Sequence, residues 1–237
     1  MTTIVTPEVQ KRIADNWLEV RADIDRACRA AGRDASDVTI VGVTKYVDAS
    51  LTKALVDAGC TDLGENRPQV LWRKAEDLDD VSIRWHLIGS LQRNKAKRTV
   101  PILHRLHSLD SLRLAQTVAE ITAMQGSVLP CMLEVNISGD ADKHGFDPKI
   151  LEAELFEIQQ LAGLRIDGLM CMASLEHPGN EAAIDFQALR KLRDNLAAKS
   201  GLPLTELSMG MSGDFEAAIA EGSTIVRIGS RLFEGVR

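Results

Sequence analysis

The chain has 237 residues, of which 45% are hydrophobic and 26% are charged, close to an average globular protein. This composition excludes a disordered or fibrous protein and allows a large buried core. The 34 acidic residues outnumber the 28 Lys and Arg residues, which gives a formal net charge of −6. A net acidic charge disfavours proteins that bind duplex DNA or anionic membranes.

The cysteines and the N-terminus point to the cellular compartment. No two of the four cysteines, at positions 28, 60, 131 and 171, have the spacing of a metal clip or a CxxC motif. Residues 1–7 lack the basic and apolar parts of a secretory leader, and no apolar run approaches the ~20 residues of a membrane helix. We expect a soluble cytoplasmic protein with reduced cysteines, no metal and no membrane partner.

The first predicted element is a helix over about residues 7–31. Thr6 can cap it, Pro7 suits its first position, apolar residues recur three and four positions apart, and Gly32 ends it. After it, short apolar strands alternate with helices. Strands are predicted over residues 38–45, 61–65, 83–89, 103–108, 129–137, 164–170, 204–209 and 224–229. Helices are predicted over residues 50–58, 68–78, 92–100, 111–125, 147–161, about 180–200 and 214–221.

Eight strand–helix units in this length predict an α/β fold, a single (β/α)8 barrel of the TIM type. The strands lack polar alternation, which is typical of strands that are buried on both faces. The alternative is a doubly wound open sheet, which usually has fewer strands and a Gly-rich first turn. The turn after Lys45 contains no glycine, and this favours the barrel. We expect one domain over residues 1–237, with the additional helix at 7–31 and the barrel at about 38–237.

Lys45 stands at the carboxyl end of the first predicted strand, where barrel enzymes place reactive groups. It could simply extend its amine to the solvent at the barrel rim. Alternatively, it is an amine in a dry pocket with a lowered pKa, ready to react with a carbonyl.

Two Gly/Ser segments, residues 208–214 and 227–230, follow the seventh and eighth strands. A Gly-rich turn alone often reflects only loop geometry. These two loops, however, form the usual phosphate site of such barrels, and the first loop opens a helix with free N–H groups. Together with Lys45 they indicate a phosphate-bearing carbonyl compound, for which pyridoxal 5′-phosphate (PLP) is the obvious candidate.

Arg227 lies two residues before Gly229 on the last predicted strand. It could form an ion pair with Glu65 or Asp214 at the rim. Alternatively, it donates a hydrogen bond to the pyridine nitrogen of PLP. Arginine cannot protonate that nitrogen, so the ring would remain a poor electron sink.

The chain resembles the PLP homeostasis proteins, also called proline synthase co-transcribed homologues. These are single-domain relatives of the N-terminal barrel of alanine racemase, a PLP fold of type III. The resemblance runs from Val38 to Gly235. It is carried by residues 43–45, 64–66, 85–92 with 94–95, 207–212 and 226–229 with 233 and 235. Ser90 and Ser230 depart from the proline and threonine that are common in the family, although Ser230 keeps the hydroxyl.

The resemblance implies the roles of seven cofactor residues: Lys45 as the Schiff-base amine, Asn66 and Met209 as pocket lining, Ser212, Gly229 and Ser230 at the phosphate, and Arg227 at the ring nitrogen. Lys143 matches a loop lysine that family members can use as a second, transient cofactor amine. The resemblance also implies PLP as the cofactor, apo PLP enzymes as its recipients, and a monomer.

The remaining polar candidates have simpler interpretations. We interpret His86 as a packed or hydrogen-bonded barrel histidine rather than a general base. His104, His107 and His177 look like surface or loop residues without ligand spacing, so a metal site is not expected. The basic residues 92–98 contain no interleaved aromatic residue, which favours a solvated helix face over a nucleic-acid patch.

Two functions remain open: a carrier that buffers PLP without turnover, and an amino-acid racemase or related lyase. A racemase needs a second base on the opposite face of the ring. Alanine racemase takes a tyrosine from another domain for this role, and the only tyrosine here is Tyr46. We expect Tyr46 to point away from the cofactor, because neighbours on a strand face opposite sides. The carrier is therefore preferred, and a regulatory partner of other PLP enzymes is compatible with it.

Overall fold

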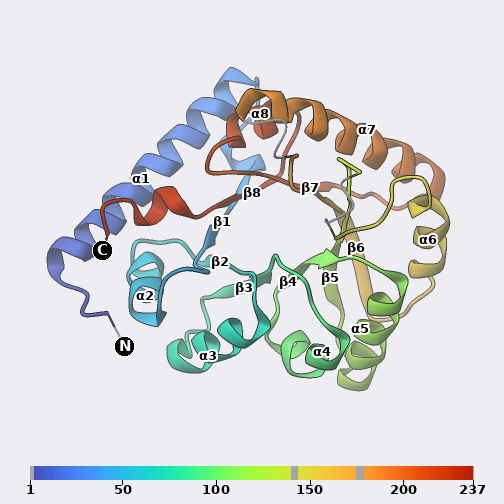
Figure 1. The fold of residues 1–237 in the computed structure, drawn as a ribbon, viewed down its shortest axis with the longest axis horizontal. Coiled ribbons are helices and arrows are strands. Elements are labelled where there is room, and N and C mark those ends of the chain that lie inside the picture. The colour runs from blue at the N-terminus through green and yellow to red at the C-terminus, as the bar shows by residue number, and fades with distance from the viewer. Residues whose placement is uncertain (1–2, 140–143, 175–178, 237) are drawn as a thin grey trace.

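The structure is a computed structural model and describes residues 3–139, 144–174 and 179–236. Its centre is a closed barrel of eight parallel strands in sequence order, in which β8 pairs with β1. Helices form a ring around the strands (Figure 1). The closed barrel confirms the predicted fold class, and the open sheet is excluded.

The elements follow the predicted alternation. The strands are β1 (Thr39–Val43), β2 (Asp62–Glu65), β3 (Arg84–Leu87), β4 (Arg105–Leu109), β5 (Leu129–Glu134), β6 (Leu164–Met170), β7 (Glu206–Met211) and β8 (Ile225–Ile228). The α-helices are α1 (Pro7–Ala30), α2 (Ala49–Asp57), α3 (Pro68–Leu78), α4 (Arg93–Thr99), α5 (Leu112–Gln125), α6 (Leu151–Ile158), α7 (Ala183–Ser200) and α8 (Phe215–Ala220). Short 3-10 helices are η1 (Ala35–Asp37), η2 (Val100–Ile102), η3 (Gly179–Ala182) and η4 (Ser230–Phe233).

Two strand boundaries differ from the prediction in ways that matter for the site. β1 ends at Val43 and not at Lys45, because the chain turns there and the Val47 N–H donates to the Thr44 carbonyl at 3.1 Å. β7 begins two residues later than predicted, because Leu204 adopts a positive φ of 39°, outside the extended region in which a leucine forms a strand. Lys45 therefore lies in a turn, while Met211 is still part of a strand.

The N-terminal helix α1 completes the ring of helices. Each of the strands β1 to β7 is followed by an α-helix, and among the described residues β8 is followed by the 3-10 helix η4. α1 packs against α8, α2 and η4, so it closes the ring of helices between α8 and α2. Asn16 of α1 donates to the carbonyls of Leu232 and Glu234 at 3.2 and 2.9 Å, and Asp23 pairs with Arg231.

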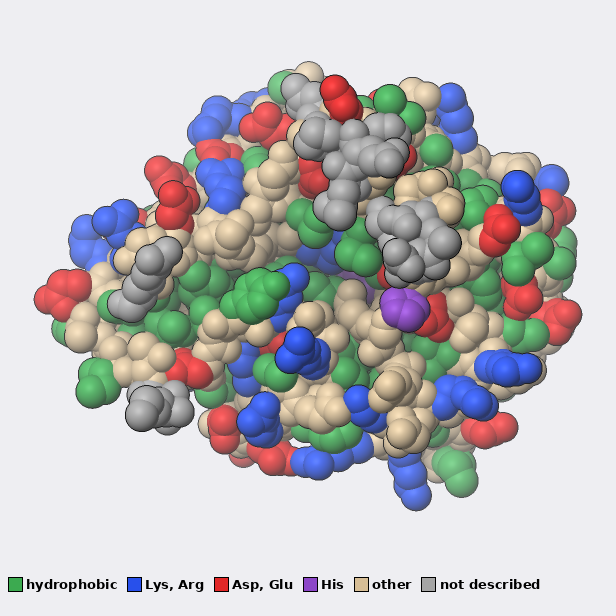
Figure 2. All heavy atoms as spheres, viewed as in Figure 1, with side chains coloured by type: hydrophobic (Ala, Val, Ile, Leu, Met, Phe, Trp, Pro, Cys, Tyr) green, Lys and Arg blue, Asp and Glu red, His purple; other side chains and the backbone are tan. Residues whose placement is uncertain are grey.

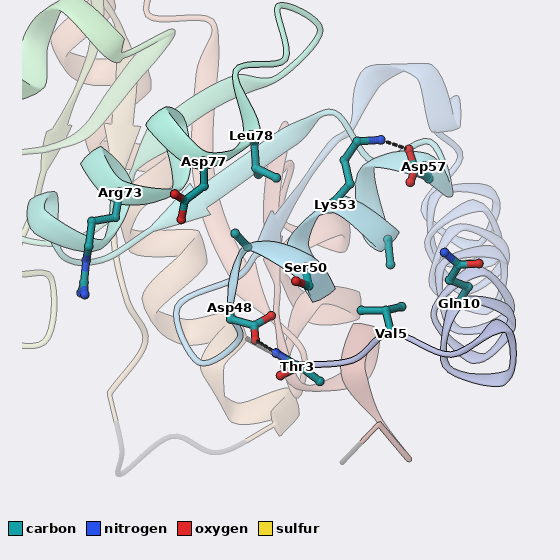
Figure 3. Close-up of a pocket in the computed structure, with 12 residues that line it drawn as sticks. Thr3, Val5, Gln10, Asp48, Ser50, Lys53, Asp57, Arg73, Asp77 and Leu78 are labelled. Carbon is teal, nitrogen blue, oxygen red and sulfur yellow. Dashed lines mark hydrogen bonds and ion pairs between the residues drawn. The ribbon is translucent and has the colours of Figure 1, made fainter. Parts of the chain in front are cut away.

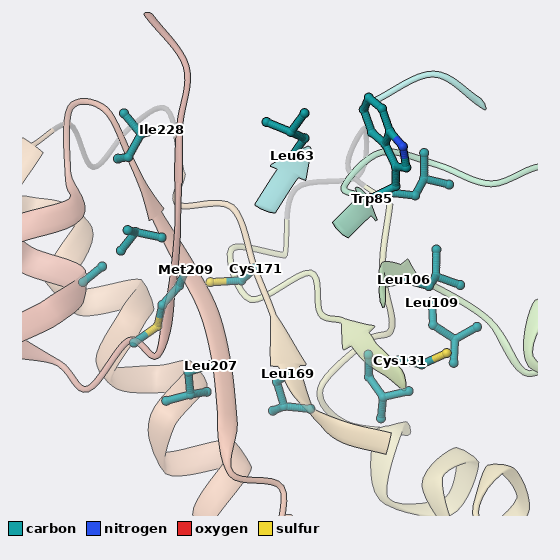
Figure 4. Packing of buried hydrophobic residues seen from close by; sticks show 14 of the residues in the cluster. Leu63, Trp85, Leu106, Leu109, Cys131, Leu169, Cys171, Leu207, Met209 and Ile228 are labelled. Atoms are coloured by element: carbon teal, nitrogen blue, oxygen red, sulfur yellow. The ribbon is translucent and has the colours of Figure 1, made fainter. Parts of the chain in front are cut away.

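The apolar core has two layers. The larger layer lies between the strands and the helices, and Figure 4 shows part of it, including Leu63, Leu106, Leu207 and two cysteines, Cys131 and Cys171. A second cluster consists of Val41, Met132, Met170 and Ile225, from β1, β5, β6 and β8. Residues from these opposite sides can meet only inside the barrel, so this cluster fills its interior. In the described part of the chain, no helix is long and apolar enough to cross a membrane.

Candidate functional site

A cavity of about 520 Å³ opens at the carboxyl ends of the strands, a volume within the usual range of small-molecule sites. Figure 2 shows this face of the molecule, which is hollowed near its centre between hydrophobic and basic side chains. The cavity is lined by Val43, Lys45, Tyr46, Val47, Asn66, Ile88, Gly89, Met172, Met211, Ser212, Gly213, Arg227, Gly229, Ser230 and Phe233. Six of the seven cofactor residues expected from the sequence are among them.

Lys45 reaches the cavity from the turn after β1, where its side chain is half-buried. The turn is held by its first carbonyl, that of Thr44, which accepts hydrogen bonds from the Val47 N–H and from Nζ of Lys74. Nζ of Lys45 lies 5.0 Å from the centre of the Tyr46 ring. The backbone that carries Lys45 is thus fixed by hydrogen bonds, while the Lys45 side chain remains accessible from the cavity.

A buried ion pair between Lys74 and Glu65 stabilises this turn on the side away from the cavity. Nζ of Lys74, on α3, lies 2.5 Å from Oε1 of Glu65, and the Thr44 hydroxyl donates to the same oxygen at 2.6 Å. Burial lowers the pKa of Lys74, although the charge and hydrogen bond of Glu65 counteract this. The sequence pointed to Glu65 as a strand-end residue and as an alternative ion-pair partner of Arg227. The role of Lys74 was missed because nothing in a helix sequence shows which lysine faces inward.

The phosphate-side candidates come from the two neighbouring loops after β7 and β8. The Gly229 N–H donates to the Ser212 hydroxyl oxygen at 3.2 Å, which ties the two loops together. Ser230 is exposed and begins η4. A Cβ at Gly229 would lie 3.4 Å from Cβ of Val43, an ordinary contact, so the protein itself does not require glycine there. Gly229 lines the cavity, and its lack of a side chain keeps the space beside the backbone free of atoms from this residue.

Asn66 and Gly89 lie together at the ends of β2 and β3. A Cβ at Gly89 would meet the Asn66 carbonyl oxygen at 2.4 Å, which is too close for any other residue. The Gly89 carbonyl accepts a hydrogen bond from the Ser108 hydroxyl at 2.8 Å. This close approach fixes the backbone from which Asn66 reaches the cavity.

Arg227 extends from β8 into the floor of the cavity and is only 4% exposed. Its guanidinium donates to Ser208 Oγ at 2.7 Å and to the Cys171 carbonyl at 2.9 Å. No carboxylate in the described part of the chain lies within ion-pair distance, so the rim pairing with Glu65 or Asp214 is not formed. Burial lowers the pKa of Arg227, which is nevertheless a donor-only cation near neutral pH.

Three expectations need correction. Met209 does not line the cavity: it is fully buried in the outer core, where Figure 4 shows it near Leu207 and Cys171. Its neighbour Ser208 faces the barrel interior, and strand alternation turns Met209 outward. Methionines 172 and 211 line the cavity instead.

Tyr46 does not point away from the cavity but lines it, with 89% of its surface exposed. The prediction assumed a strand through Lys45, whereas both residues lie in the turn, where alternation does not apply. His107 is not a surface residue: it is fully buried and hydrogen-bonded inside the barrel. His86 is hydrogen-bonded in the barrel, as we interpreted it. Lys143 and His177 lie outside the described residues.

Glu134, at the end of β5, is a buried titratable residue that the sequence did not single out. It is 4% exposed, and its Oε2 has no hydrogen-bond partner among the described residues. Burial, followed by the nearby charge of Asp110, raises its pKa to about 7, while the charge of Arg227 acts in the opposite direction. Glu134 is thus able to change its charge near neutral pH.

A larger cleft of about 780 Å³ lies between the N-terminal segment, α2 and α3 (Figure 3). Its charged groups are of both signs, and several are engaged with their own neighbours: Lys53 pairs with Asp57, and Asp48 accepts hydrogen bonds from the Thr3 and Leu51 N–H groups. The described residues contain no cluster of three or more His, Cys, Asp or Glu side chains that could hold a metal ion. The cavity around Lys45 therefore remains the candidate site.

Comparisons with known proteins identify the family of the chain. The family model described as alanine racemase, N-terminal domain, matches residues 28–235. A Pseudomonas aeruginosa protein named pyridoxal phosphate homeostasis protein is 40% identical over 221 residues, which cover 93% of this chain and 94% of that protein. The Escherichia coli protein of the same name is 33% identical and covers 93% of this chain and 95% of its own length. The chain belongs to the pyridoxal phosphate homeostasis protein family.

Solved structures give the same result. PipY of Synechococcus elongatus, solved with PLP bound, has a TM-score of 0.84 and 35% identity and covers 93% of this chain and 99% of its own. An unknown protein from Bifidobacterium adolescentis has a TM-score of 0.90 and 37% identity, with 98% of both chains covered. Alanine racemase of Clostridium difficile has a TM-score of 0.72 at 15% identity, and the similarity covers 96% of this chain and 56% of the racemase. The last comparison shows a shared fold alone.

Proposed function

We propose that this protein binds PLP in the cavity around Lys45 and carries or buffers it without catalytic turnover. The observation that carries the proposal is that one cavity is lined by three kinds of functional group: the Lys45 amine, the Ser212 and Gly229 donors, and the Arg227 guanidinium. When bound, PLP supplies an aldehyde that condenses reversibly with a primary amine and releases water. Lys45 provides that amine.

The residues present fit the parts of PLP. The Ser212 hydroxyl, the Gly229 N–H and the Ser230 hydroxyl lie on adjoining loops and can share the phosphate oxygens. Arg227 can direct an N–H at the ring nitrogen from the cavity floor. Asn66 lies beside the ring position at the ends of β2 and β3, and Ile88 and the methionines supply apolar walls.

The racemase alternative is supported less. Racemisation needs proton-transferring groups on both faces of the ring. Lys45 and Tyr46 approach from the same turn, and the side of the cavity formed by β6 and β7 contributes Met172 and Met211, which carry no titratable proton. The relatives are named for PLP homeostasis, which supports a carrier.

We further propose that the whole chain acts as one PLP-binding domain, as a cytoplasmic monomer that passes PLP to apo PLP enzymes. The four buried free cysteines support a reducing compartment. A nucleic-acid partner is not proposed for α4, because Arg98 lies over the Trp72 ring at 4.5 Å and pairs with Glu76 at 2.7 Å. A second cofactor amine at Lys143 remains a proposal from the family resemblance.

Borohydride reduction of the PLP-loaded protein, followed by peptide mapping, tests the assignment of Lys45. We expect a reduced adduct on Lys45 in the wild type and its loss in Lys45→Arg. Lys74→Arg, which alters the neighbouring buried lysine but keeps its charge, is the matched control and should retain the adduct. An adduct on any other lysine as the main product would overturn the assignment.

A further inference from the structure

A continuous chain of hydrogen bonds runs through the interior of the barrel and ends at Arg227. Arg227 donates to Ser208 Oγ at 2.7 Å, and Ser208 Oγ lies 2.8 Å from Nδ1 of His107. Nε2 of His107 lies 2.8 Å from Nδ1 of His86, and Nε2 of His86 lies 3.0 Å from Oδ1 of Asp62. Ordinary pocket lining does not require such a chain, and the proposed binding of PLP does not by itself explain it.

This hydrogen-bond chain crosses the interior of the barrel, from the strands on one side to the strands on the other. Its carboxylate and histidines belong to β2, β3 and β4, while Ser208 and Arg227 belong to β7 and β8. Ser208 and both imidazoles are at most 2% exposed. At the far end, Asp62 also binds Arg84, whose side chain reaches the surface at the amino end of the barrel.

The two ends of the chain fix the direction of every proton in it. Arginine can only donate, so Ser208 Oγ accepts from Arg227 and its own O–H is free to point at His107. Nδ1 of His107 then accepts, and its proton lies on Nε2, which donates to His86. The same step places the proton of His86 on Nε2, where the carboxylate of Asp62 accepts it.

The electrostatic environment agrees with this arrangement. Burial lowers the pKa of both histidines, and the charge of Arg227 lowers the pKa of His107 further, so both rings are neutral near pH 7. Burial alone would raise the pKa of Asp62, but the hydrogen bonds from His86 and Arg84 outweigh it, and the carboxyl is ionised. The chain therefore has a cation at one end and an anion at the other.

We propose that Asp62, His86, His107 and Ser208 are positioning residues that hold Arg227 as a fixed hydrogen-bond donor toward the ring nitrogen of PLP; the role at the ring rests on the proposed function. The aligned bonds polarise one another and strengthen Ser208 as the acceptor for the guanidinium. The hydrogen-bond chain does not deliver protons to the cofactor, because proton transfer along it would require Arg227 to accept a proton, and a guanidinium cannot do so.

The proton directions can be tested without any cofactor. In ¹⁵N-labelled protein at pH 7, long-range ¹H–¹⁵N spectra should show His86 and His107 as neutral rings protonated on Nε2 and bare on Nδ1. His86→Gln and His107→Gln assign the two signals. A proton on Nδ1 of either ring would overturn the proposal.

The positioning role is tested with three variants and titration of PLP. His107→Leu removes the donor and the acceptor, and we expect at least ~10-fold weaker binding and a displaced absorption band of bound PLP. His107→Gln supplies an acceptor and a donor on one planar group and should restore both to near the wild type. Met132→Leu, a volume-conserving change in the barrel interior, is the control for packing and should change neither.

The outcomes separate the two proposals. If Lys45 fails to form the adduct in the wild type while the histidine tautomers are as described, the proposed function fails and the hydrogen-bond chain stands. If the adduct forms and His107→Leu binds PLP as tightly as the wild type, or His107→Gln is impaired equally, the positioning role is overturned. Should His107→Leu not fold, Ser208→Ala removes the direct acceptor of Arg227 and is read in the same way.

Discussion

Nζ of Lys74 lies 2.7 Å from the carbonyl oxygen of Thr44, the residue immediately before the proposed cofactor lysine. The two residues come from α3 and from the turn after β1, so a buried helix cation fixes the backbone that presents Lys45. Glu65 neutralises that cation within the protein. The lysine that faces the cavity is thus held in place by a second lysine that does not face it.

Lys74→Met should destabilise the protein by about 3–5 kcal/mol, because it leaves the buried Glu65 carboxylate without its opposite charge. The measurement is the free energy of unfolding from urea titration. The double variant Lys74→Met with Glu65→Leu should recover most of the loss, since it removes both charges. Lys53→Met, which breaks the exposed pair with Asp57, is the control and should cost less than about 1 kcal/mol. Equal losses in the two single variants would contradict this account.

Gly229→Ala should fold normally but bind PLP at least ~10-fold more weakly, because the added methyl group fits against Val43 but crowds the N–H that faces the phosphate. Equilibrium dialysis gives the affinity, and thermal unfolding gives the stability. The contrasting variant is Gly89→Ala, in which the methyl group would strike the Asn66 carbonyl and impair folding itself. A Gly229→Ala protein with unchanged affinity would place the phosphate elsewhere.

Ser212→Ala should weaken PLP binding by ~10- to 100-fold, the loss expected from removing one hydrogen bond to a charged phosphate, about 1.5–3 kcal/mol. The affinity for pyridoxal, which lacks the phosphate, should change little in the same variant. This comparison locates the effect at the phosphate. Equal weakening for both ligands would show that Ser212 acts through the structure of the loop instead.

Glu134 should make stability depend on pH. Its pKa is raised from an ordinary value of 4.5 to about 7 in the folded protein, so folding favours the protonated form. The contribution of Glu134 to the free energy of unfolding is therefore complete below pH 4.5 and is lost as the pH rises through 7. The advantage of Glu134→Gln over the wild type in free energy of unfolding should therefore be about 1–3 kcal/mol larger at pH 8 than at pH 4.5. An advantage that does not vary with pH would contradict the raised pKa.

The PLP-loaded protein should not racemise alanine or other common amino acids at an enzymatic rate. Loss of one of two placed bases typically removes ~10²–10⁴-fold of rate, and the described residues offer titratable groups only on the Lys45 side and at Arg227. Deuterium exchange at the α-carbon, followed by NMR, measures this directly. Rapid exchange with loss of stereochemistry that disappears in both Lys45→Ala and Tyr46→Phe would restore the racemase alternative.

Strand order, helix order and most of the cavity lining could be predicted because they depend on local patterns. Apolar runs separated by helix caps predict a barrel, and a barrel brings all strand ends to one face, so Lys45, Ser212 and Arg227 were expected near one another. The errors arose one residue at a time. Tyr46 was placed by strand alternation, which fails because β1 ends two residues before Lys45. Met209 was placed in the pocket by the family resemblance alone, whereas alternation along β7 turns it outward.

The interior hydrogen-bond chain could not be predicted from the sequence. Its members are separated by 101 positions between His107 and Ser208 and by 24 between Asp62 and His86, with no motif that links them. Only the closure of the barrel brings these strands face to face. From the sequence alone His107 was expected at the surface, because a buried histidine needs hydrogen-bond partners and a single sequence does not show them. Inside the barrel these partners are present, so the polar ring can be buried.

The clamp between α1 and the segment after β8 determines when the cavity can form during synthesis. Asn16 binds the carbonyl of Leu232, which leaves the ribosome 216 residues later, and Gly229 and Ser230 lie in the same late segment. Domains emerge from the N-terminus first, so the part of α1 that packs against α8 and η4 stays uncovered until those elements have been made. A nascent chain that lacks residues 229–233 therefore has no complete cavity, so PLP can be held there only after this segment has been made.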